Sequence, residues 1–494
     1  MGLKWKVKIM SKKSIKKNYL YNLCYQILVV ITPLITTPYL SRVLGADGIG
    51  TVSYAESIVA YFVVFANLGI TIFGQREISY VQDDIKRRSQ LFWETKLLSL
   101  ITSLASLCVF LVYVIAKSKT SLYFVLAFNI LSVTADITWL FQGLEEFGKI
   151  VFRNFVIKLL NVAYIFVFIR NKNDYLLYAL GIGLFLFLGN VSLWVYLPKY
   201  IEKIDLSKIR PFRNLGTVLT LFLPTVAIQI YAVLDKTMIG LITGSAFENG
   251  YYEQAMKISK ILLTIVTSLG AVMIPRIGYY YEKKDYKKVE EYMYQSYRFV
   301  WFMGVPLCFG LIGVSSNFVP WFYGTGFDKV VPLLSILGFL IISIGISNIT
   351  GLQYLVPTKR QKYLTISVCI GAATNLILNL VLIKKYQAIG AAIASVIAES
   401  SVAISQLVLI QKEISIKKVV KSGIVYFLCG GVMLFAVKIL SSVLSPSIIN
   451  TVILVFCGIT VYSLMLILFR DYFFINNSKI VFKKITMTIR PKGD

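Results

Sequence analysis

Long apolar segments alternate with short polar connections along the whole sequence. A hydrocarbon core about 30 Å thick requires roughly 20 apolar residues in one helix, so each segment predicts a membrane-spanning helix. The longest connections have about 20 residues, which is well below the size of an independent domain. The fourteen predicted spans are residues 19–40, 52–75, 92–116, 121–142, 151–169, 175–197, 215–241, 250–274, 297–317, 330–356, 363–383, 387–410, 421–443 and 447–470.

The composition also indicates a membrane protein. Of the 494 residues, 57% are hydrophobic and only 15% are charged, and the mean hydropathy is +0.72. Soluble domains are considerably more polar than this. The basic first residues run directly into a full-length apolar span without a small-residue cleavage site, so we expect the first span to be retained.

The formal net charge of +27 reports membrane topology. Lys and Arg lie mainly in the short connections, and cytoplasmic loops carry an excess of both residue types. With a cytoplasmic N-terminus, about 34 basic residues fall on the cytoplasmic side and about 8 on the other. We therefore expect a multi-pass protein of the cytoplasmic membrane with both termini, residues 1–18 and 471–494, on the cytoplasmic side. Nucleic acid is not an expected partner.

Cysteine and histidine usage excludes several kinds of site. The six cysteines all lie inside apolar spans and form no CxxC motif, so we interpret them as free thiols. The sequence contains no histidine, which excludes a His-based zinc site, a His general base and a His proton relay. No metal site and no cofactor are predicted.

An internal repeat is visible when the sequence is compared with itself at a shift of about 200 residues. Six spans separate the copies, so the two halves share one orientation and are related by an axis along the membrane normal. We expect six-helix bundles at residues 19–197 and 215–410, a basic cytoplasmic linker at 198–214, and two additional helices at 421–470. The matching residues are Gly50 and Gly250, Ala55 and Ala255, Ile58 and Ile258, and Arg76 and Arg276, with Arg42 corresponding to Lys236.

Several charged residues fall inside the predicted spans. A charge at the centre of a membrane helix costs about 2.5 to 3.5 kcal/mol on insertion scales, so such residues mark an interior path or a paired structural contact. Arg42 lies at the end of the first span. The charges within spans are Glu56, Asp136, Lys158, Asp235, Lys236, Glu253, Lys257, Lys260 and Glu399.

The segment "GYYEQAMKISKILL" places Glu253, Lys257 and Lys260 on one face of a helix, because their spacing is four and then three residues. Two interpretations are open: a Glu253 to Lys257 pair that closes a protein interface, or the wall of a cavity. The second cation, Lys260, favours the cavity wall. Asp136 and Lys158 are equally compatible with a structural pair.

Five segments resemble the Wzx-type polysaccharide flippases of the multidrug/oligosaccharidyl-lipid/polysaccharide exporter superfamily, and the likeness covers nearly the whole chain. The first is the most specific to that family. The segments are "NYLYNLCYQILVVITPLITTPYLSRVLGADGIGTVSYAESIVAYF" (18–62), "GQREISYVQDD" (74–84), "LDKTMIG" (234–240), "GYYEQAMKISKILLTIVTSLGAVMIPRI" (250–277) and "GAAIASVIAE" (390–399).

The resemblance implies an all-α membrane protein with fourteen helices, arranged as two six-helix bundles plus two. It implies that an undecaprenyl-pyrophosphate-linked oligosaccharide is moved to the outer leaflet by alternating access, for capsule, O-antigen or a related polymer. It also implies a cationic cavity, with Arg42, Lys236 and Lys257 as candidates and Lys158 and Lys260 as further ones. A polysaccharide polymerase and glycosyltransferases are candidate partners beside the lipid bilayer.

The chemistry of such a substrate leads to the same type of site. A diphosphate with attached sugars does not dissolve in lipid, so a flippase requires a wet chamber with Lys or Arg inside it. On this interpretation Arg42 lies at the outer gate and faces Glu56. Carboxylates in transport paths commonly bind a proton or Na⁺. The candidate coupling or gating carboxylates are Glu56, Asp136, Asp235 and Glu253.

Three alternatives were compared with the flippase. A multidrug and toxin cation antiporter should have an acidic chamber, whereas the candidate charges are mixed in sign. A peptidoglycan-precursor flippase differs only in the sugar carried. A membrane-embedded polymerase or glycosyltransferase would need a large outer loop or a catalytic acid with a metal, and the outer loops are nearly all under about 14 residues. We therefore predict a transporter without catalytic residues.

Overall fold

The computed structural model describes residues 12–117, 121–205, 207 and 209–478, and these residues form helices and connections without any strand. The ends of the predicted basic termini lie outside the described residues. The chain divides into two units, Met1–Gly250 and Tyr251–Asp494. The predicted division into bundles, linker and additional helices stays a prediction.

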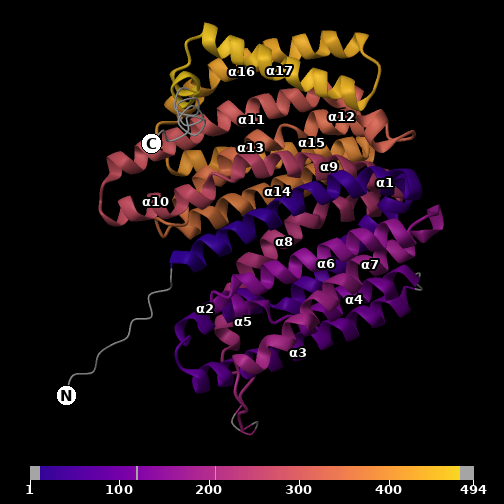
Figure 1. Cartoon of the computed structure of the whole chain (residues 1–494), viewed down its shortest axis with the longest axis vertical. Coiled ribbons are helices and arrows are strands. Elements are labelled where there is room, and N and C mark those ends of the chain that lie inside the picture. Colours follow the sequence, from indigo (N-terminus) through magenta and orange to yellow (C-terminus); the bar gives the residue numbers. More distant parts are fainter. Residues whose placement is uncertain (1–11, 118–120, 206, 208, 479–494) are drawn as a thin grey trace, which may run out of the picture. The chain divides into compact units, whose positions relative to one another are not determined.

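The first unit contains most of the helices predicted from the N-terminal half (Figure 1). Its helices pack around a core that includes Phe92, Phe110, Leu126 and Trp139, all of which are inaccessible or nearly so. The elements are α1 (Lys12–Asn67), α2 (Ile70–Tyr80), α3 (Ile85–Ala116), α4 (Ser121–Ala135), α5 (Thr138–Gly143), α6 (Phe147–Phe168), η1 (Lys172–Asp174), α7 (Tyr175–Ser192), η2 (Leu193–Lys199) and α8 (Leu215–Thr243). Helix α9 (Ala246–Thr267) crosses the boundary between the units.

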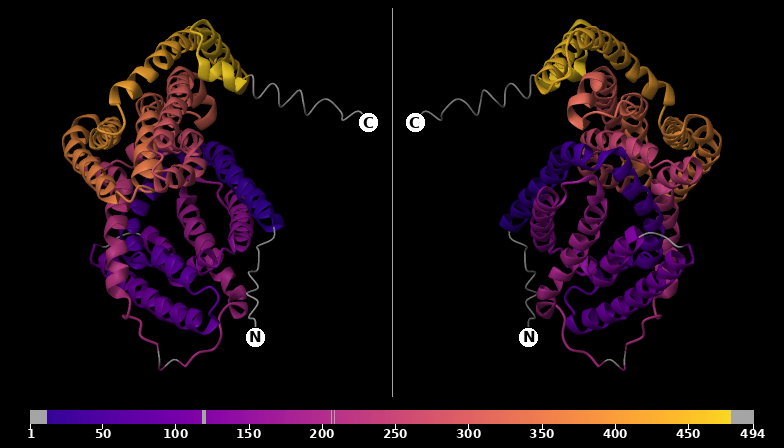
Figure 2. Two further views of the ribbon diagram at one scale, coloured as in Figure 1. Left: turned by 90° about the vertical axis from the view of Figure 1, so that its left-hand side faces the viewer. Right: turned by 90° about the vertical axis from the view of Figure 1, so that its right-hand side faces the viewer.

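The core of the second unit lies between three groups of helices: α11, the helices that precede α14, and the C-terminal pair α16–α17. Figures 1 and 2 show this pair in yellow beside α11, with which both helices are in contact. The elements are α10 (Gly270–Glu282), α11 (Tyr286–Tyr323), α12 (Val330–Leu337), α13 (Leu340–Asn348), the π-helical turn η4 (Ile349–Leu355), α14 (Gln361–Tyr386), α15 (Ala388–Leu409), α16 (Ile416–Val443) and α17 (Ile448–Leu468).

The described residues contain eleven helices that are long and apolar enough to cross a membrane, or twelve if the bent pair α9 and α10 forms one span. Many large apolar side chains are exposed, among them Val443, Ile449 and Leu468, which is expected where the surroundings are lipid rather than water. The chain is therefore a multi-pass membrane protein. These eleven or twelve helices do not establish the predicted number of fourteen spans.

Helix α1 contains the first predicted span and most of the second, whose last residues lie in α2. Its dihedral angles depart from helical values at Gly45, where φ is +69° and ψ is 177°. A left-handed φ is accessible to glycine at little cost. The direction of the chain therefore changes at Gly45, within the glycine-containing connection of the two predicted spans.

The second half of α1 meets the start of α9 at two glycines. A methyl group built on Gly50 would lie 1.7 Å from the carbonyl oxygen of Ala246, and one built on Gly250 would lie 1.9 Å from the carbonyl oxygen of Ala46. The two contacts exchange under the 200-residue shift of the sequence repeat. Reciprocity of this kind is the mark of a two-fold axis through a contact. The crossing thus joins corresponding residues of the two copies of the repeat, and the axis that relates the two halves stays a prediction.

The described cysteines are free thiols, as interpreted from the sequence, but not all of them lie in the core. Cys108, Cys308, Cys369, Cys429 and Cys457 are all free thiols. Cys308 and Cys429 are buried in the second unit, whereas Cys108 and Cys369 are exposed. Cys24 belongs to the part of α1 whose side chains are not described.

Candidate functional site

Helix α9 carries its charged residues on one face, which is flanked on both sides by buried residues. Tyr252 and Gln254 each lie about 100° from Glu253 around the helix and are each 1% exposed. The hydroxyl group of Tyr252 lies 3.0 Å from Ser395 Oγ of α15, and the hydroxyl group of Tyr323 donates a hydrogen bond to the Gln254 carbonyl oxygen at 3.0 Å. These contacts fix the rotation of α9 about its axis.

The charged face itself carries a helical ion pair. Lys257 Nζ lies 3.6 Å from Glu253 Oε1, and the two side chains keep 29% and 15% of their accessible surface. Lys260 follows one turn later and is exposed. The Glu253 to Lys257 contact of the first interpretation is therefore present, and whether this face closes an interface or lines a cavity stays a prediction. An exposed amine beside it gives the face a net positive charge.

The candidate residues of α8 flank a polar contact with α1. Thr237 is 8% exposed; its hydroxyl group donates to Ser57 Oγ at 2.9 Å and accepts from the Tyr61 hydroxyl group at 3.0 Å. Asp235 and Lys236 precede Thr237 and are partly buried. Successive helical residues are separated by about 100°, so Asp235, Lys236 and Thr237 point in three different directions from the axis of α8.

Arg42, Glu56 and Lys158 lie on two helices of the first unit, α1 and α6. Arg42 is exposed and donates from Nη1 to the Pro38 carbonyl oxygen at 2.9 Å, within its own helix. Glu56 is partly buried in the second half of α1, and Lys158 is partly buried on α6. The expected approach of Arg42 to Glu56, and the role of Lys158 in a cavity, stay predictions.

Asp136 lies at an interruption between α4 and α5. Its carboxylate accepts a hydrogen bond from the Thr138 backbone nitrogen at 2.8 Å and one from the Thr138 hydroxyl group. Such a carboxylate caps the first turn of α5 and favours its positive end. This geometry gives Asp136 a structural function, and its proposed function in coupling is a separate prediction.

Lys96 of α3 is a buried charge that the sequence analysis did not single out. It is 0% exposed, and its ammonium group donates to the carbonyl oxygens of Thr134 at 2.5 Å and Asp136 at 3.1 Å. Trp194 donates to the Ala135 carbonyl oxygen at 2.8 Å. The last carbonyl groups of α4 thus obtain partners that a continuous helix would have supplied. A cation at a helix C-terminus is also favoured by the helix dipole.

The second unit has a comparable interruption. The hydroxyl group of Tyr297, on α11, lies 2.8 Å from Thr350 Oγ1 in η4, and Tyr297 is 0% exposed. The sequence "DIT" at 136–138 corresponds to "NIT" at 348–350. In each unit a buried polar side chain from the preceding long helix contacts the interrupted one. This tripeptide is the sequence signal that could have indicated both interruptions. The 200-residue shift of the repeat does not align its two copies.

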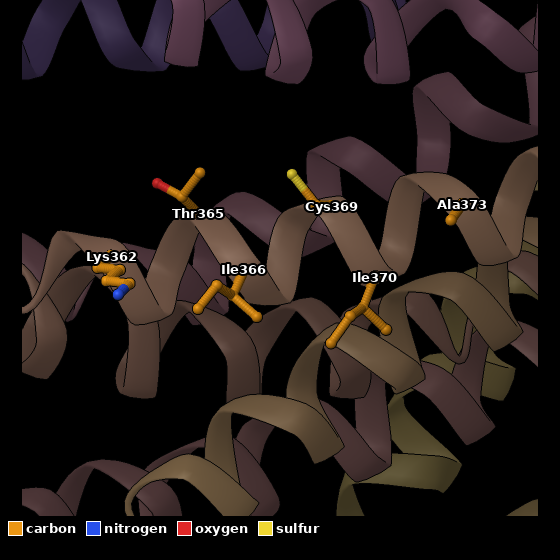
Figure 3. A pocket seen from close by; sticks show the side chains of 6 residues that line it. All are labelled: Lys362, Thr365, Ile366, Cys369, Ile370 and Ala373. Atoms are coloured by element: carbon orange, nitrogen blue, oxygen red, sulfur yellow. The ribbon is translucent and has the colours of Figure 1, made fainter.

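The larger of two hollows described in the second unit runs along α14 (Figure 3). It measures about 540 Å³ and is lined by Thr365, Ile366, Cys369, Ile370 and Ala373, with Lys362 at one end. The lining comes from one face of a single helix and is almost entirely apolar. It suits a lipid chain better than a charged diphosphate, and it contains none of the predicted site residues.

Within the described part of the chain, no group of three or more Cys, Asp and Glu is arranged to hold a metal ion. The candidate charges lie on α1, α6, α8 and α9 and in the connection between α4 and α5.

Comparisons with known proteins identify the family. The sequence model of the family "Polysaccharide biosynthesis protein" matches residues 15–280, more than half of the chain. The chain belongs to the polysaccharide biosynthesis protein family. The family "Lipid II flippase MurJ" also matches, over residues 151–473. Together the two matches place the protein among the polysaccharide flippases of the multidrug/oligosaccharidyl-lipid/polysaccharide exporter superfamily, as the five sequence segments predicted.

Relatives and solved structures agree with this family. The protein named "Putative O-antigen transporter" of Escherichia coli (strain K12) is 22% identical over 79% of this chain and 95% of its own length. Lipid II flippase MurJ, in an inward closed conformation, is 18% identical, with a TM-score of 0.68 over 92% of this chain and 99% of that one. An inward-facing multidrug transporter of the MATE family is 14% identical, with a TM-score of 0.61. The structural likenesses establish the fold, which is that of membrane transporters.

Proposed function

We propose that the protein is a flippase that moves an undecaprenyl-pyrophosphate-linked oligosaccharide from the inner to the outer leaflet of the cytoplasmic membrane, for O-antigen, capsule or a related polymer. Membership of the polysaccharide biosynthesis protein family supports this function. The Escherichia coli relative aligns over 95% of its length. Its name, which describes an O-antigen transporter, supports the substrate class.

The observation that carries the proposal is the charged face of α9. Glu253, Lys257 and Lys260 share one face of α9, where Glu253 and Lys257 keep 15% and 29% of their side-chain surface and Lys260 is exposed. The segment is long and apolar enough to cross a membrane together with α10. Two lysines facing lipid would be costly. A wet chamber resolves this cost, because water solvates the cations and a diphosphate binds them.

We propose fourteen membrane spans. The eleven apolar helices include α1 as one segment, yet its 56 residues and the break at Gly45 fit two spans. Helix α8 has 29 residues and the α9–α10 pair supplies one more, which completes the count. We expect two six-helix bundles, with α16 and α17 added to the second.

The residue roles follow from charge. Arg42, Lys236 and Lys257 would bind the diphosphate, with Lys158 and Lys260 as further cations of the chamber. Glu56, Asp235 and Glu253 would serve gating or bind a coupling proton or Na⁺; Asp136 remains a candidate although its carboxylate caps α5. Glycosyltransferases would act before transport, and a polymerase would act after it.

A transport assay tests the function. The purified protein in vesicles should accelerate the transfer of a fluorescent isoprenyl diphosphate between leaflets, as measured by quenching from outside. Arg42→Gln, Lys236→Gln and Lys257→Gln should each lower the rate at least about tenfold, equivalent to about 1.4 kcal/mol in binding the charge. Lys417→Gln, which removes an exposed lysine from the first turn of α16, is the matched control and should transport normally.

The same variants decide between the two interpretations of α9. If the Glu253 to Lys257 pair only closes an interface, Glu253→Gln and Lys257→Gln should lower the unfolding temperature equally and leave the rate unchanged. If the pair lines a chamber, Lys257→Gln should lose transport without a change in unfolding temperature. Full transport by the triple Arg42, Lys236 and Lys257 variant would refute the proposal.

Membrane orientation has its own test. In a cysteine-free background, Lys284→Cys should react with an impermeant maleimide only after the cells are opened, because the basic connection between α10 and α11, which contains this exposed residue, is predicted to be cytoplasmic. Lys385→Cys, which is exposed at the end of α14, should react in intact cells. The reverse labelling pattern would invert the proposed topology.

A further inference from the structure

A second hollow lies in the second unit where α10 approaches α11. It measures about 440 Å³ and is lined by Pro275, Arg276, Tyr279, Tyr280 and Tyr292. Its lining combines aromatic rings with one guanidinium group, unlike the apolar surface along α14. None of these residues belongs to the proposed diphosphate site.

Three tyrosines form a continuous wall. The ring centroids of Tyr279 and Tyr280 are 5.2 Å apart, in an edge-to-face arrangement of 81°. The rings of Tyr280 and Tyr292 are stacked at 5.5 Å and 28°. Because each ring contacts the next, the wall holds its shape, and its phenol groups remain available as hydrogen-bond donors.

Three cations lie over the tyrosine rings of this wall. The Arg276 guanidinium carbon lies 5.9 Å from the Tyr292 ring centroid. Lys283 Nζ lies 4.4 Å from the Tyr279 centroid and Lys288 Nζ lies 4.8 Å from that of Tyr280. Cation–π contacts of this geometry hold a charged group in place while leaving it hydrated on the other side.

Neighbouring cations are neutralised by carboxylates. Lys359 pairs with Glu282 at 2.7 Å, and Arg360 pairs with Glu413 at 2.5 Å. Burial opposes ionisation of Glu413, but hydrogen bonds from Arg360 and Tyr354 outweigh it and lower the pKa of its carboxyl group. Glu413 is therefore ionised at neutral pH and cancels the charge of Arg360.

Arg276 differs from these cations. Among the residues that the structure describes, no carboxylate lies within ion-pair distance, 4.0 Å, of its guanidinium group. The comparison with the first half of the repeat is direct: Arg76 donates to the Glu77 carboxylate at 2.8 and 3.0 Å. The position that follows Arg276 is Ile277, which is 0% exposed. Where the first copy has an acidic partner, the second copy has a core residue, and the hollow lies beside its arginine.

The hollow lies at the level of the membrane surface. Helix α11 has 38 residues, which corresponds to about 57 Å at 1.5 Å per residue, whereas the hydrocarbon core is about 30 Å thick. Its first turns, which carry Lys288 and Tyr292, therefore extend into the headgroup region. Tyrosine and basic residues are enriched at that depth.

We propose that this hollow binds the phosphate group of an anionic phospholipid, with Arg276 as the bidentate ligand and the tyrosine wall as the contact for the glycerol and ester groups. Arg forms two parallel hydrogen bonds with a phosphate. Lys283 and Lys288 supply the surrounding positive potential that attracts anionic lipid. The site is independent of the proposed transport cavity.

Native mass spectrometry of the full-length protein tests the proposal, with phosphatidylglycerol and phosphatidylcholine as probes in matched detergent micelles. The wild type should retain phosphatidylglycerol in preference to phosphatidylcholine. Arg276→Gln should weaken phosphatidylglycerol binding about tenfold, and Arg276→Lys should show an intermediate loss because a point charge replaces the bidentate contact. Arg76→Gln is the matched control and should bind as the wild type does.

Three outcomes would overturn the proposal: unchanged phosphatidylglycerol binding by Arg276→Gln, equal retention of both lipids by the wild type, or displacement of the bound lipid by millimolar inorganic phosphate. The last result would identify a site for free anions. Equal unfolding temperatures of the Arg276→Gln and Arg76→Gln proteins exclude misfolding as the cause of lost binding.

Discussion

Replacement of Gly50 or Gly250 by valine is expected to abolish transport. Each glycine meets a backbone carbonyl group, not the end of a flexible side chain, so an added side chain would lie under 2 Å from the oxygen. A small movement of backbone atoms in packed helices cannot relieve such a contact. The α1 to α9 crossing must therefore separate, and a barrier across the membrane cannot close at that point.

The reciprocity of the crossing gives this prediction a second, sharper part. Separation of the two helices relieves both contacts at once, so the Gly50→Ala, Gly250→Ala double variant should lose less than the sum of the single losses. Gly216→Ala and Gly431→Ala are the controls, because nothing lies within 4 Å of a methyl group built at either position. Transport rate and membrane abundance are measured in parallel. Normal transport by Gly50→Val would contradict the packing.

Replacement of Lys96 by methionine is expected to destabilise the first unit severely. Methionine fills the same volume but leaves the Thr134 and Asp136 carbonyl oxygens without the donors that they have in the structure. An unsatisfied buried polar group costs about 1 to 3 kcal/mol, so the loss should be about 2 to 6 kcal/mol. The measurement is the fraction of folded protein recovered by size-exclusion chromatography after a temperature ramp.

The control for this variant lies on the same helix. Lys117 follows the last turn of α3 and is exposed, so Lys117→Met should leave the unfolding temperature nearly unchanged. Lys96→Arg keeps the charge and the donors and should recover part of the stability, although the larger group is confined. A Lys96→Met protein as stable as the wild type would show that the contacts of Lys96 contribute nothing.

The positions of the apolar spans could be predicted because burial in lipid imposes a length and a composition on every segment. Each of the fourteen predicted spans overlaps a helix of the structure. The charged face of α9 could also be predicted, because residues four apart on a helix are neighbours whatever surrounds them. The structure contains the expected pair at 3.6 Å.

Interruptions inside spans could not be predicted in this way. The sequence around Asp136 is as apolar as that of a continuous helix, and the break persists because Lys96 and Trp194 satisfy carbonyl groups from elsewhere in the chain. Such partners are tertiary contacts that periodicity does not report. Lys96 itself was missed because the predicted span began at residue 92, whereas α3 begins at Ile85, so the lysine resembled a charge near a helix end.

The burial of Lys96 also has a consequence for biosynthesis. On insertion scales a lysine within a membrane helix opposes entry by about 2.5 to 3.5 kcal/mol, and its partners are synthesised 38 and 40 residues later. Helix α3 should therefore leave the translocation machinery together with α4 and α5, as a hairpin in which the amine is already bonded. The methionine variant would then enter the bilayer more readily than the natural chain, even though its mature form is weaker.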